Sequence, residues 1–312
     1  MKKGFFKLAL VSAMAFVCAT ADAQAQAPQW AQEQATVQQI GPNMSVGAKG
    51  WDGNNEILYQ IVALNPEFEL VQEEFGETTK SFDYEVKVIG VSPAFASKTG
   101  DAAAINILFE DQIESSTGTT TVKITSIEKI ECLKLTTMKP TTDALTNITK
   151  LTVGYSKRLN QPEYNQCKAG ISSIADGALA GLTGLTDIVT YNTEPITVSE
   201  TSFPEDAFSS IKVTVPKDAK GLGTVAGKFV KNAVWRKFIK EKNFYVNGAS
   251  SFFCDFNCDK RFNTTDNKKL VDYYNTDGEY TGKANLLSRD INGDGRFNLS
   301  DAKKLLDYYN EE

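Results

Sequence analysis

The sequence predicts an α+β protein in which a β-rich body precedes a small all-α module. Strand-like runs separated by clusters of Gly, Asn, Asp and Thr extend from residue 56 to residue 215. Near the C-terminus, one segment of 15 residues occurs twice at an offset of 35 residues. An alternating acidic segment precedes each copy. Strands are therefore expected first along the chain and helices last.

The N-terminus predicts a secretory signal peptide over residues 1–23. A charged start at Lys2 and Lys3 precedes an apolar run from Leu8 to Ala19 and a small-x-small cleavage site that ends at Ala23. The apolar run is too short to span a bilayer, and no later run reaches the roughly 18 residues that spanning requires. We therefore expect a secreted protein, extracellular or on the cell surface, without a membrane span.

The charge and the composition exclude several classes of partner and of catalysis. The formal net charge is −6, and loss of the signal removes three lysines and one aspartate, a net +2, which gives −8. Such an acidic protein does not match nucleic acid or anionic lipid, so we expect neither as a partner. The sequence has no histidine, which excludes histidine-based catalysis and histidine-ligated zinc. The absence of histidine does not exclude a glycosidase, which needs only two carboxylates, but residues 40–250 contain no paired-carboxylate motif.

Residues 24–39 are rich in Ala and Gln and predict a linker, and residues 40–244 form the predicted body. A helix is expected over 224–242, and its apolar stripe consists of Val225, Phe229, Val234, Phe238 and Ile239. This helix should cap the core, with Trp235 packed on the last repeat, and a basic amphipathic helix that lies on a membrane is the alternative. The predicted strands of the body are Glu56–Leu64, Tyr84–Val91, Ile105–Phe109, Thr120–Ile127, Leu151–Tyr155, Ile188–Tyr191 and Ile211–Val215.

Several runs in the body share the pattern apolar-x-x-apolar-x-apolar. It occurs at Ile130–Leu135 and Ile148–Val153, and it begins and then slips at Leu182–Ile188. The segment 174–188 resembles one repeat of the leucine-rich surface proteins of anaerobic bacteria. This resemblance implies a leucine-rich-repeat-like body, and a β-sandwich is the competing fold.

The duplicated segment follows a loop with calcium-binding spacing. Arg261–Asn275 and Arg296–Asn310 agree at 11 of 15 positions. The loops before them, 255–266 and 290–301, carry oxygen side chains at positions 1, 3, 5, 9 and 12, and calcium takes six to eight such oxygens, including a main-chain carbonyl at position 7. The predicted ligands of two Ca²⁺ ions are Asp255, Asn257, Asp259, Arg261, Asn263 and Asp266 in the first loop, and Asp290, Asn292, Asp294, Arg296, Asn298 and Asp301 in the second.

The two loops differ at position 6, where a sharp turn requires a positive φ. Gly295 suits this turn in the second loop, whereas Lys260 occupies it in the first and costs about 1–2 kcal/mol there. We therefore expect the first site to be the weaker one. A helix is expected after each loop, capped by Asp266 and Asp301.

Two such loops, each with aspartate at positions 1 and 12 and each followed by one helix, resemble the type I dockerin over residues 250–312. The resemblance implies a small all-α, EF-hand-like domain with two calcium ions that docks onto a cohesin domain in an extracellular, cellulosome-like assembly that degrades polysaccharide. The resemblance also implies a set of partner-contacting residues, which are Thr264, Thr265, Lys268, Lys269, Leu299, Ser300, Lys303 and Lys304. For the lysines of this set, the alternative is a solvated helix face without a partner.

Four cysteines follow the signal, an even number for an oxidising compartment. The spacing favours bridges between Cys132 and Cys167 and between Cys254 and Cys258, and buried free thiols are the alternative.

The leading function is a non-catalytic binding or adhesion body, with a glycan or host protein as its ligand, attached by a calcium-dependent docking module. No catalytic residues are assigned. A dockerin-bearing glycoside hydrolase or carbohydrate-binding component is the first alternative, and a structural surface protein braced by calcium is the second.

Overall fold

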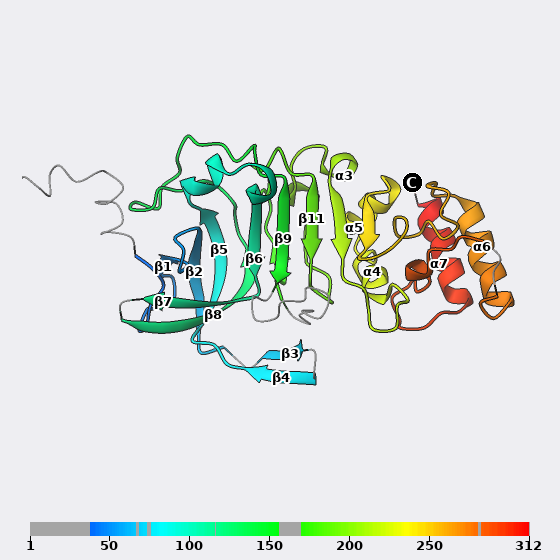
Figure 1. Ribbon diagram of the computed structural model, residues 1–312, viewed down its shortest axis with the longest axis horizontal. Helices are drawn as coiled ribbons and strands as arrows, with labels where there is room; N and C mark the ends of the chain where they lie inside the picture. Colours follow the sequence, from blue (N-terminus) through cyan, green and yellow to red (C-terminus); the bar gives the residue numbers. More distant parts are fainter. Residues whose placement is uncertain are drawn as a thin grey trace, which may run out of the picture.

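The structure is a computed structural model that describes residues 38–66, 69–73, 76–115, 117–155, 170–279 and 282–311. It shows an α/β protein with one mixed sheet, one parallel sheet and, within the described residues, five α-helices (Figure 1). The predicted signal peptide 1–23 and nearly all of the predicted linker 24–39 lie outside the described residues.

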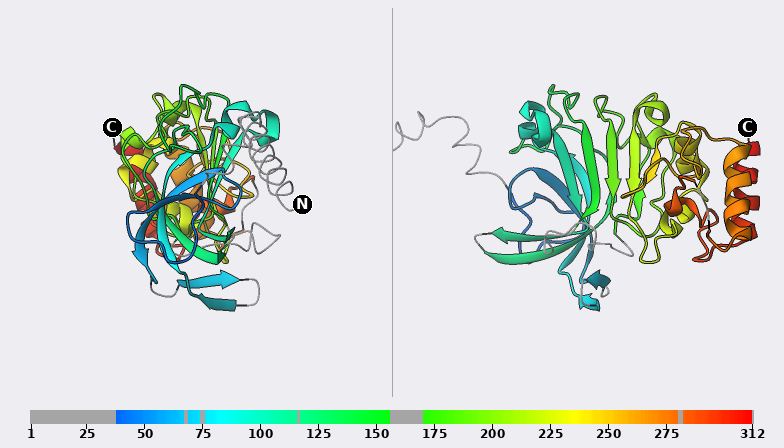
Figure 2. Two further views of the ribbon diagram at one scale, coloured as in Figure 1. Left: turned by 90° about the vertical axis from the view of Figure 1, so that its left-hand side faces the viewer. Right: turned by 45° about the vertical axis from the view of Figure 1, so that its right-hand side comes forward.

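The mixed sheet lies in the N-terminal half of the described chain. Its strand order is β1-β2-β5-β8-β10, with β7 also paired to β8. Neighbours β1 and β2, β2 and β5, and β7 and β8 are antiparallel, whereas β8 runs parallel to both β5 and β10. A separate hairpin of β3 (Glu69–Glu73) and β4 (Gly76–Lys80) protrudes from this end of the molecule (Figures 1 and 2). The strands of the mixed sheet are β1 (Lys49–Trp51), β2 (Ile57–Leu64), β5 (Tyr84–Val91), β7 (Glu110–Ser115), β8 (Gly118–Ile127) and β10 (Ser173–Ile174).

The second sheet is entirely parallel, in the order β13-β12-β11-β9-β6. Its register aligns one apolar residue from each strand: Ile105, Leu151, Ile188, Val213 and Phe244. All five are buried, so the face of the sheet on which they lie packs against the core. The alternate residues of these strands are less buried: Asn106 is exposed, and Val189 and Thr214 are half-buried. Its strands are β6 (Ala104–Leu108), β9 (Lys150–Tyr155), β11 (Asp187–Thr190), β12 (Lys212–Val215) and β13 (Phe244–Val246).

Two helices lie in the connection between β12 and β13. The single helix predicted over 224–242 is in fact α4 (Thr224–Phe229) and α5 (Ala233–Lys240). The break falls where the Asn232 side chain accepts a hydrogen bond from Val234 N and so caps α5. Trp235 is fully buried as predicted, and its Nε1 donates to Ile196 O at 2.8 Å.

The remaining described helices are α3 (Ala207–Ser210), α6 (Thr264–Asn275) and α7 (Leu299–Asn310). Short 3-10 turns occur at Pro93–Ser97, Gly100–Ala102, Glu200–Ser202 and Leu286–Ser288.

The predicted fold class is wrong: the structure does not show a β-rich, leucine-rich-repeat-like body followed by an all-α dockerin. From β11 onward, helices lie between the parallel strands, α3 before β12 and α4 and α5 before β13, because parallel strands need crossover connections. The C-terminal region also shares one apolar core with the two sheets, through residues such as Phe253 and Leu305. Phe253 N donates to Phe244 O at 2.6 Å, so the chain passes from the last strand into this region without leaving the core.

Candidate metal-binding loops

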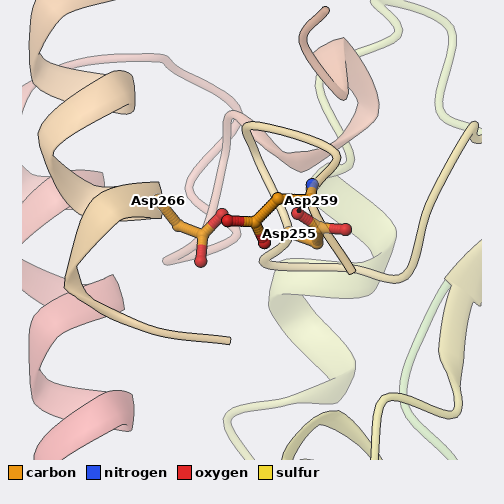
Figure 3. A group of neighbouring side chains, drawn as sticks. All are labelled: Asp255, Asp259 and Asp266. Carbon is orange, nitrogen blue, oxygen red and sulfur yellow. Dashed lines mark hydrogen bonds between the residues drawn. The ribbon is translucent and has the colours of Figure 1, made fainter. Parts of the chain in front are cut away.

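The predicted calcium ligands lie in two loops that lead into α6 and α7. In the first loop, Asp255 and Asp266 are buried and Asp259 is exposed. One carboxylate oxygen from each of the three lies within 4.8 Å of the others, and Figure 3 shows the side chains pointing toward one another. The structure therefore brings together positions 1, 5 and 12 of the first loop.

The two loops hold the same hydrogen bonds at an offset of 35 residues. In the first loop, the carboxylate of Asp255 accepts from Asp259 N at 3.1 Å and from Lys260 N at 2.9 Å. In the second, Asp290 accepts from Asp294 N at 3.0 Å and from Gly295 N at 2.7 Å. Duplication of the sequence thus extends to duplication of the loop conformation.

Position 12 is held in the same way in both loops. Asp266 accepts from Asn257 N at 3.3 Å and from Asn263 N at 3.0 Å. Asp301 accepts from Asn292 N at 3.2 Å and from Asn298 N at 2.9 Å. These bonds tie the last carboxylate back to positions 3 and 9 of its own loop.

The helix caps differ from the prediction. Asn263 and Asn298 are the N-cap residues, and their side chains accept from Thr265 N at 2.7 Å and from Ser300 N at 2.8 Å. Asp266 and Asp301 were expected as caps but stand three residues later, as the reciprocal partners of a capping box. The helices begin earlier than predicted because the amide side chain at position 9 already satisfies an N–H group of the first turn.

Backbone strain falls where the sequence predicts it. Lys260 has φ 64° and Gly295 has φ 84°, so both loops use the left-handed conformation at position 6. Position 4 is also left-handed, with φ 59° at Cys258 and φ 65° at Gly293. The second loop has glycine at both positions, whereas the first holds two L side chains in a conformation that disfavours them.

Burial makes the position-12 carboxyls harder to ionise. Desolvation raises the pKa of Asp266 to about 6, against the lowering effect of the hydrogen bonds from Asn263 and Asn257, and the charges of Asp255 and Asp259 raise it further. The pKa of Asp301 is raised by the same causes. A bound cation among these carboxylates would favour the ionised forms.

Each position-1 carboxylate also accepts a hydrogen bond from a hydroxyl outside its loop. Ser251 Oγ donates to Asp255 Oδ2, and Thr224 Oγ1 donates to Asp290 Oδ2 at 2.7 Å. Neither hydroxyl is among the ligands or contacts predicted from the sequence. Ser251 precedes its loop by four positions and could have been suspected from proximity, but nothing in the sequence pairs Thr224 with Asp290.

The predicted partner contacts lie near the first turns of α6 and α7. Thr264, Thr265, Lys268, Leu299, Ser300 and Lys303 are exposed, and Lys269 and Lys304 are half-buried. The hydroxyls at position 11 are already engaged, because Thr265 Oγ1 and Ser300 Oγ accept from Asn257 Nδ2 and Asn292 Nδ2 at 2.9 and 2.7 Å. Leu299 is 50% exposed and is the apolar residue available to a partner at the second loop.

The cysteines are free thiols wherever the structure describes them. Cys254 is buried, and Cys258 Sγ lies 3.3 Å from Ser250 Oγ. The predicted bridge between Cys254 and Cys258 is therefore not formed in this structure. Cys132 is a buried free thiol, and its predicted partner Cys167 lies outside the described residues.

Comparisons with family models, curated proteins and solved structures give no match for this chain. Among the described residues, no helix has the length and apolar character needed to cross a membrane.

Proposed function

We propose that this chain is a secreted, non-catalytic binding or adhesion protein whose C-terminal region binds two calcium ions and attaches the body to a cohesin-type partner. The resemblance of its duplicated loops to the type I dockerin supports this function. In such a role the protein would belong to an extracellular assembly that degrades polysaccharide. The ligand of the body would be a glycan or a host protein.

The observation that carries the proposal is the repeated loop conformation. An acidic cluster alone is common without a metal, but here two loops 35 residues apart in sequence hold the same carboxylates in the same hydrogen bonds. A turn that served only to reverse the chain would not require the same oxygen side chains at five positions in both copies.

The donor chemistry of the loops fits calcium. Every side chain at positions 1, 3, 5, 9 and 12 is Asp or Asn, so the donors are hard oxygens, which suit calcium and not soft or borderline metals. The main-chain carbonyls of Arg261 and Arg296 would complete each set at position 7. When bound, calcium would supply positive charge among the six aspartates of the two loops and hold each loop closed on the first turn of its helix.

Calcium titration of the full mature chain tests this proposal. We expect two ions to bind, and we expect the melting temperature to fall when a chelator removes them, because the ions bind the folded loops better than the unfolded chain. Magnesium at equal concentration is the control, since it demands a smaller and more regular site. A chain that binds no calcium, and whose melting is the same in chelator, would contradict the proposal.

The docking step needs a separate measurement. We expect an immobilised type I cohesin domain to capture the chain in calcium and to release it in chelator. Calcium binding without capture of any of a panel of cohesins would favour the structural surface protein instead. Release of reducing sugar by the purified chain, abolished by one Asp or Glu substitution in the body, would contradict the non-catalytic assignment.

A further inference from the structure

A segment of the body packs directly on the second loop. Leu222 O accepts hydrogen bonds from Arg289 N and Asp290 N, both at 3.0 Å, at the point where this loop begins. The turn that presents Leu222 is itself fixed by Asp218, whose carboxylate accepts from main-chain N–H groups, including Gly223 N at 2.6 Å and Thr224 N at 2.9 Å. The entry to the second loop is thus held by the body.

The contact is too close for side chains. A Cβ atom on Gly227 in α4 would lie 2.4 Å from Asp290 O and 2.6 Å from Gly293 N. A Cβ on Gly293 would in turn lie 2.4 Å from Lys228 N. The backbone of α4 therefore touches the backbone of the second loop at positions 1 and 4, and a shift of one would displace the other.

One side chain of the body reaches the predicted ligand set itself. Thr224 Oγ1 donates to Asp290 Oδ2 at 2.7 Å, and Asp290 is position 1 of the loop. The equivalent bond in the first loop comes from Ser251, four residues before Asp255. In the first loop, the hydroxyl that donates to position 1 therefore comes from the same segment of chain. In the second loop it comes from a residue 66 positions upstream.

We infer that the second calcium site is completed by the body, with Thr224 as a positioning residue that orients the Asp290 carboxylate toward the metal. The inference rests on the proposed function, because it concerns one of the two calcium sites named there. The first site is independent of this contact. By reciprocity, calcium in the second loop stabilises α4, so the two regions are energetically coupled.

Single-site backgrounds isolate each loop. Asp255→Ala leaves the second site alone to be measured, and Asp290→Ala leaves the first. In the Asp255→Ala chain, we expect Thr224→Val to weaken calcium binding about tenfold, the lower end of the loss seen when a hydrogen bond to a metal ligand is removed. Thr224→Ser keeps the hydroxyl and should restore the affinity.

The matched control is the hydroxyl of the other loop. In the Asp290→Ala chain, Ser251→Ala should weaken the first site to a similar degree, whereas Thr224→Val should leave it unchanged. Hydrogen exchange tests the coupling between the second loop and α4: calcium should slow exchange of the α4 amides in the Asp255→Ala chain and leave them unchanged in the Asp290→Ala chain. The rescue by Thr224→Ser is the readout that separates a role of the hydroxyl from packing alone.

The outcomes separate this inference from the proposed function. Equal calcium affinity with Thr and Val at position 224, or a loss that is the same at both sites, would overturn the positioning role while leaving calcium binding intact. A wild-type chain that binds no calcium would overturn both. Selective weakening of the second site, with rescue by serine, is the result that the structure leads us to expect.

Discussion

Lys260→Gly should stabilise the protein, although it removes a side chain. Lys260 is exposed and has φ 64°, a conformation that costs an L residue about 1–2 kcal/mol. Its bond to Asp255 Oδ2, 2.9 Å long, comes from the main-chain N–H and is retained by glycine. Glycine also makes the unfolded chain more flexible, which costs about 0.4–1 kcal/mol. The net gain therefore lies between about 0 and 1.6 kcal/mol, with a midpoint of about 0.8 kcal/mol.

The assay is thermal unfolding in chelator, so that metal binding does not contribute. A gain of this size corresponds to a rise of about 2 °C in melting temperature for a chain of this length. Lys260→Ala is the control for the lost charge, because alanine keeps the Cβ atom and the strain, and it should give no comparable rise.

Gly295→Ala in the second loop is the converse control. Gly295 has φ 84°, and a Cβ atom there would meet no neighbour within 4 Å, so only backbone strain changes. We expect it to lower the melting temperature. If Lys260→Gly leaves stability unchanged or lowers it while Gly295→Ala also has no effect, then position 6 is not held in a strained left-handed conformation.

Three further changes test the packing. Burial raises the pKa of Asp52 from 3.8 to about 6. The stability that the protonated carboxyl contributes is fully present below pH 3.8 and is lost as the pH rises through 6. Between pH 4 and pH 8, the free energy of unfolding of Asp52→Asn should therefore rise by up to about 3 kcal/mol relative to wild type, measured by urea unfolding. Gly227→Ala should destabilise by about 1–3 kcal/mol despite the better helix propensity of alanine, because its Cβ would collide with Asp290 O; a melting temperature above wild type would contradict this contact. Trp235→Phe should cost about 1–3 kcal/mol in the same urea assay, since Ile196 O loses its donor inside the core, and a change within error would mean that water replaces it.

Local structure was predicted well because it follows from short-range patterns. The run Tyr84–Val91 alternates buried and partly buried residues along most of its length and is β5 with the predicted bounds. The helices after the loops were predicted from the spacing of Leu270 and Leu305 with their tyrosines, and both leucines are buried. Positive φ at Lys260 followed from comparison with Gly295.

Long-range arrangement was not predicted, because it depends on contacts between distant residues. The register that aligns Leu151 with Ile188 joins strands separated by 37 residues, and apolar spacing alone is equally compatible with repeats or a sandwich. The bond from Thr224 to Asp290 spans 66 residues and leaves no periodic signal. Gly227 and Gly293 were the available signals, since a glycine inside a helix or loop often marks a close backbone approach.

The shared core has a mechanical consequence. Arg236 of α5 lies over the buried ring of Tyr308 in α7 at 4.9 Å and pairs with Glu311 at 2.6 Å. Side-chain contacts therefore join the helices of the body to the C-terminal region, in addition to the shared apolar core. A flexible linker would allow the body to take many orientations relative to the C-terminal region. In this structure the two regions share one core instead, so their relative orientation is fixed. A partner bound to α6 and α7 would therefore also fix the orientation of the parallel sheet, which shares its core with these helices.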